Sequence, residues 1–80
     1  MSIAWPLPPT TFERWASELK LSRPDIEIQP LNPTEKEWQK YADAVNQSAV
    51  CQTYSTPRSS AFKTWDQWAI AFIRAFGANA

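Results

Sequence analysis

Residues 64–77, TWDQWAIAFIRAFG, constrain the fold more than any other segment because they are apolar on nearly every side. At about 100° per residue, a helix here carries its aromatic residues and Ala69 on one face. Ile70 and Ile73 extend the apolar surface well beyond that face. A helix that is apolar nearly all round is buried on more than one side. A chain of 80 residues has little with which to cover both sides, so we expect part of this helix to contact another protein chain.

Three capping boxes, in each of which a threonine is followed three residues later by Glu or Gln, predict the starts of three helices. The threonines are Thr10, Thr34 and Thr64, and the helices are expected at about 11–21, 35–52 and 65–76. Gly77 stands where a left-handed residue can close the last helix. Each of the first two helices has one apolar stripe and one polar face, which is typical of helices that share a core.

Prolines predict extended backbone on both sides of the first helix. Residues 1–9 contain three prolines and are expected to form an extended arm, with Trp5 and Leu7 as its anchors. Residues 6–9 also fit the P-x-x-P pattern of SH3 ligands, but a packed arm is favoured because no arginine lies close by. Residues 24–33 are expected to be extended, either as a strap across the helices or as a strand that pairs with the edge of another chain. The predicted fold class is therefore all-α: a small three-helix domain over residues 10–80, with a proline-rich N-terminal arm and a strap between helices 1 and 2.

The residue types that most enzymes and metal sites use are scarce in this chain. It has no histidine and one cysteine, Cys51, which excludes a Cys/His zinc site and favours a small buried side chain. Asp66 is the one carboxylate surrounded by aromatic residues, and its place in a first helical turn explains it as a partner of the helix dipole. Gly77 is the only glycine, so a glycine-rich phosphate loop is impossible. We expect no enzymatic activity, no catalytic residue, no cofactor and no metal.

The charge balance provides no electrostatic footprint for nucleic acid or for an anionic membrane. Eight basic and eight acidic residues cancel, and they are distributed without blocks. A single-strand nucleic-acid binder that stacks bases on tryptophan is therefore the least favoured function. The longest apolar run, residues 68–73, is too short to span a membrane, and residues 1–9 lack the features of a signal peptide. We expect a soluble protein that is intracellular during its synthesis.

Residues 62–69, FKTWDQWA, resemble the ending of various small phage-encoded structural and assembly proteins, in which a threonine-capped W-x-x-W-A helix follows a proline- and serine-rich loop. The resemblance covers the C-terminal quarter of the chain and implies a virion component or assembly factor. We therefore expect a non-enzymatic subunit, a phage structural or adaptor protein, that docks on a larger assembly or forms an oligomer. The alternative is a soluble regulatory or inhibitory binder of a host or viral protein. The expected partner-binding residues are Trp5, Leu7, Trp68, Ile70 and Ile73.

Overall fold

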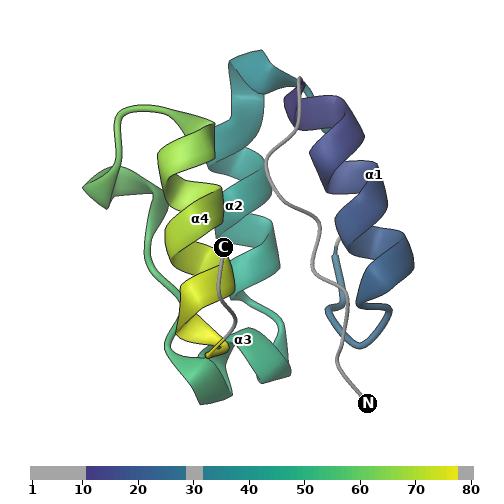
Figure 1. The fold of residues 1–80 in the computed structure, drawn as a ribbon, viewed down its shortest axis with the longest axis vertical. Helices are drawn as coiled ribbons and strands as arrows, with labels where there is room; N and C mark the ends of the chain where they lie inside the picture. The colour runs from purple at the N-terminus through teal and green to yellow at the C-terminus, as the bar shows by residue number, and fades with distance from the viewer. Residues whose placement is uncertain (1–10, 29–31, 78–80) are drawn as a thin grey trace.

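A computed structural model describes residues 11–28 and 32–77 of the chain, and the regular elements in these ranges are all helical (Figure 1). In chain order they are α1 (Phe12–Ser22), η1 (Glu35–Glu37), α2 (Trp38–Asn46), α3 (Ala49–Tyr54), η2 (Ser59–Ala61) and α4 (Trp65–Ala75), where η marks a short 3₁₀ helix. The predicted all-α class is confirmed. The predicted arm, residues 1–9, lies outside the described residues. Within the described ranges, none of the helices has the length and apolar character needed to cross a membrane.

Helices α1, α2 and α4 lie side by side and run in the same direction (Figure 1). Near their starts, the ring of Phe12 in α1 lies 5.2 Å from that of Tyr41 in α2 and 5.4 Å from that of Trp65 in α4. At the opposite end, the guanidinium of Arg23, directly after α1, lies 5.1 Å from the ring centre of Phe76, directly after α4. Starts therefore meet starts and ends meet ends, which defines a parallel three-helix arrangement.

The two long connections follow from this parallel arrangement. An 11-residue helix is about 16 Å long, so each return to the starting end needs at least about five extended residues. Twelve residues, 23–34, separate α1 from η1, and ten residues, 55–64, separate α3 from α4. In the first connection Ile26 is buried in the core and Ile28 packs against it. The described part of the predicted strap therefore packs on the helices of its own chain.

A cluster of aromatic rings fills the space between the three helices, with Trp15 of α1 at its centre. The rings whose centres lie 5.6–6.4 Å from that of Trp15 are those of Phe12, Trp65, Trp68 and Phe72. Aromatic pairs in edge-to-face or tilted arrangements contribute roughly 0.5–1.5 kcal/mol beyond their buried area. The predicted core face of the last helix is confirmed for Trp65, Ala69 and Phe72, which are buried, whereas Phe76 on the same face is only partly buried and packs against the core.

The second helix, predicted to be continuous from 35 to 52, is interrupted twice, and the prediction of three helices is wrong in this respect. Its first turn is the 3₁₀ helix η1, and α2 ends at Asn46 before α3 begins at Ala49. Ser48 adopts an extended conformation between α2 and α3, and its hydroxyl donates to the Val45 carbonyl. A serine side chain that bonds a nearby carbonyl offers the backbone an alternative to the helix, which explains the break.

The helix ends differ from the predicted capping boxes. Thr11 is the N-cap of α1, and its hydroxyl oxygen accepts from the Arg14 N–H at 3.2 Å. The carboxylate of Glu13 instead accepts from the backbone N–H of Glu35, 3.2 Å away, and so ties the start of α1 to η1. The N-cap residues of η1 and α4 make no side-chain capping bond. Gly77 follows α4 with φ +82°, which confirms the predicted left-handed residue at this end.

Candidate contact surface at the helix ends

Two of the predicted partner-binding residues, Trp68 and Ile73, are fully buried within this chain, so they present no surface to a partner in this structure. The ring of Trp68 lies 5.6 Å from that of Trp15 in α1 and 6.1 Å from that of Trp38 in α2. The parallel packing therefore covers Trp68 of α4 with helices of the same chain. Ile70 is half-buried and keeps some surface. Trp5 and Leu7 lie outside the described residues.

The loop between α3 and α4 adds to the cover over Trp68. The Pro57 carbonyl accepts from the indole N–H of Trp68 at 3.0 Å and from the Asn46 side-chain amide at 2.9 Å. The Thr56 hydroxyl donates to the side-chain oxygen of Asn46 at 2.6 Å. These bonds satisfy the polar edge of a buried tryptophan and hold the loop against α2 and α4. Thr56 and Pro57 therefore stabilise the packing of this loop.

An aromatic pair and an arginine lie together where α1, α3 and α4 end. Tyr54, the last residue of α3, is 49% exposed, and its ring centre lies 4.7 Å from that of Phe76. The Phe76 ring is also in contact with the Arg23 guanidinium, at a distance that allows a cation–π interaction. We name the set Arg23, Asp25, Tyr54 and Phe76 the aromatic–arginine surface.

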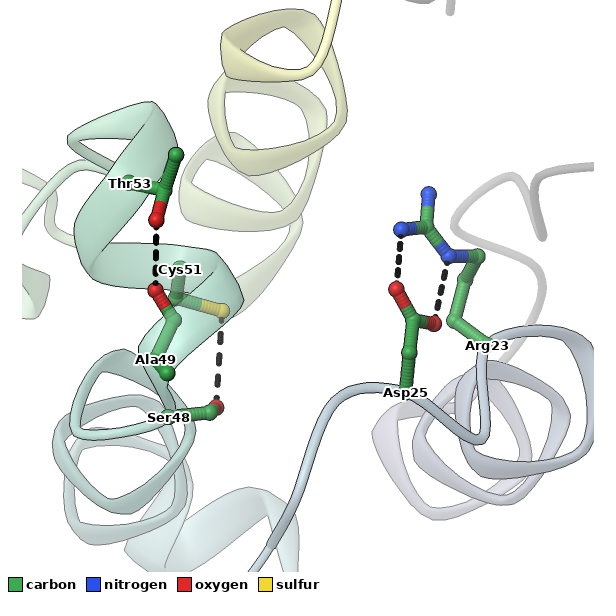
Figure 2. A network of polar contacts seen from close by, with 6 residues as sticks. All are labelled: Arg23, Asp25, Ser48, Ala49, Cys51 and Thr53. Atoms are coloured by element: carbon green, nitrogen blue, oxygen red, sulfur yellow. Dashed lines mark hydrogen bonds and ion pairs between the residues drawn. The ribbon is translucent and has the colours of Figure 1, made fainter.

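Arg23 is held in one orientation by Asp25, as Figure 2 shows. Its Nε and Nη2 atoms donate to the two carboxylate oxygens of Asp25 at 2.9 and 2.6 Å, which is a bidentate pair. The Arg23 side chain is only 12% exposed, whereas that of Asp25 is 49% exposed. The hydrogen bond from Arg23 lowers the pKa of Asp25, and the same bond raises the pKa of Arg23. A bidentate pair adds geometric specificity to its energy, so Asp25 fixes the orientation of the Arg23 guanidinium next to the Phe76 ring.

Acid should weaken the contribution of this pair to stability. The folded-state pKa of Asp25 lies below its unfolded value, near 3.9, so the carboxylate stabilises the folded state above about pH 4 and loses this effect as the pH falls through the folded-state pKa. We expect Asp25→Asn to be less stable than the natural chain at pH 7, and the difference to shrink below about pH 4. Urea melts of the two chains at pH 7 and at several pH values below about pH 4 measure this difference in stability. A difference that stays constant down to about pH 2 would contradict the pairing.

Two helical residues with titratable side chains, Cys51 and Tyr41, are buried in the core. Cys51 is fully buried, as predicted, and its sulfur is hydrogen-bonded to the Ser48 hydroxyl, with 3.6 Å between the oxygen and the sulfur (Figure 2). Burial raises the pKa of its thiol, which lowers the fraction of reactive thiolate. Tyr41 is buried too, burial raises the pKa of its hydroxyl, and that hydroxyl has no hydrogen-bond partner among the described residues. Over residues 11–28 and 32–77, no three His, Cys, Asp or Glu side chains group closely enough to hold a metal ion.

Comparisons with protein-family models, with curated proteins and with solved structures each found no match for this chain. The candidate surface therefore rests on the geometry of the chain itself. Sequence reasoning missed Arg23, Tyr54 and Phe76 as parts of one surface. The available signal was Tyr54, an aromatic residue that directly precedes the polar turn 55–60 and therefore has few apolar neighbours in sequence.

Proposed function

We propose that this chain is a non-enzymatic interaction subunit that docks on a larger protein assembly through the aromatic–arginine surface. The half-exposed ring of Tyr54, packed on Phe76, is the observation that carries the proposal. Tyrosine and arginine are enriched among the few residues that supply most of the binding energy at protein interfaces. A tyrosine has only two side-chain torsions, and contact with Phe76 already limits them, so little conformational entropy is lost when it binds.

The rest of the described surface offers less to a partner. Leu21 is 83% exposed, but a single exposed apolar side chain is ordinary in a soluble protein. Ile70 is half-buried on α4, and its neighbours Asp66, Gln67 and Arg74 are exposed and polar. Tyr54 differs from both because it adjoins a second aromatic ring and, through that ring, an arginine.

The kind of assembly is a separate question from the surface used. The resemblance of residues 62–69 to the ends of small phage proteins favours a virion structural or adaptor protein. The alternative is a soluble regulatory binder that masks a host or viral protein. Stoichiometry distinguishes the two: a fixed copy number in a purified particle supports the structural subunit, and a soluble one-to-one complex supports the regulatory binder.

A photo-crosslinking amino acid placed at position 54 tests the surface whatever the identity of the partner. Replacing Tyr54 by a benzophenone derivative of phenylalanine keeps an aromatic ring at the site, and irradiation in the producing cells should yield one discrete protein adduct that mass spectrometry can identify. The same substitution at Ser17, on the exposed face of α1, is the matched control and should yield none. A third probe replaces Ile70 on α4. An adduct at position 70 or 17 without one at position 54 would reject this surface, and an adduct with nucleic acid would reject the proposed class of partner.

A further inference from the structure

We draw no further inference here: the strongest candidate, the docking of a proline-rich segment such as residues 6–9 of a second copy on the Tyr54–Phe76 pair where α3 and α4 end, rests on aromatic character alone, because nothing in the described residues shows what covers that end.

Discussion

Replacing Trp68 with alanine is expected to lower the free energy of unfolding by about 3–5 kcal/mol, the usual cost of removing a buried aromatic ring. Trp68 is fully buried between α1 and α2, and its indole N–H donates to the Pro57 carbonyl. Small domains have a total stability of roughly 5–15 kcal/mol, so the loss should consume most of the margin. Thermal melting measures it, since each 1 kcal/mol lowers the Tm of a chain this size by about 4–8 °C.

Two further variants separate packing from hydrogen bonding at this position. Trp68→Phe keeps an aromatic ring in the core but removes the donor to Pro57, so we expect a smaller loss, roughly 1–2 kcal/mol. Leu21→Ala removes an apolar side chain that is largely exposed and should change stability by less than about 0.5 kcal/mol. If Trp68→Ala cost no more than Leu21→Ala, Trp68 would not be the core residue described here.

Replacing Ile73 with glutamate should prevent folding. Ile73 is fully buried in the aromatic core, and an ionised carboxylate there would have neither a partner nor water. The cost of burying such a charge exceeds the stability that a small domain has available. Circular dichroism at neutral pH should show the loss of helix and of any cooperative melting transition.

Ile70→Glu is the matched control on the same helix. Ile70 is only half-buried, so its carboxylate can remain in contact with water. We expect a folded chain with a loss of about 1 kcal/mol, which is typical of point substitutions. Equal loss of folding in the two variants would mean that the two sides of α4 are equally buried, contrary to the structure.

The core face of α4 could be predicted from the sequence because it depends on the helical period alone. Trp65, Ala69 and Phe72 recur at the spacing of one helix face, and all three are buried. The end of the helix could be predicted for a similar reason, since only Gly77 can adopt a positive φ at little cost. Local patterns are sufficient for each of these features.

The helices that cover Trp68 of α4 could not be predicted, because the answer depends on helix direction. The two long connections allow α1, α2 and α4 to run in parallel, so α1 and α2 both reach Trp68. Neither periodicity nor capping residues specify that arrangement. The same limit applies to the contact surface, since Arg23, Tyr54 and Phe76 are distant in sequence and meet only where three elements end.

The break after α2 had a local cause that the helical pattern concealed. The predicted apolar stripe continues from Val45 to Ala49, so the pattern alone indicates one long helix, whereas Ala49 is exposed and Cys51 is buried. Ser48 interrupts it by bonding the Val45 carbonyl. The same serine hydroxyl also lies near the Cys51 sulfur. Both groups that the Ser48 hydroxyl contacts, the Val45 carbonyl and the Cys51 sulfur, belong to residues three positions away in sequence.

Amide hydrogen exchange of the free, full-length chain tests the central claim, that its own chain buries Trp68 and Ile73 of α4 together with the predicted core face. We predict that the amides of Ala69, Phe72 and Ile73 exchange only through global unfolding, as slowly as those of Trp15 and Ala16 in α1. If the α4 amides exchanged many-fold faster than those of α1, α4 would be a loosely attached helix that needs a partner to complete its burial, and the central claim would be wrong.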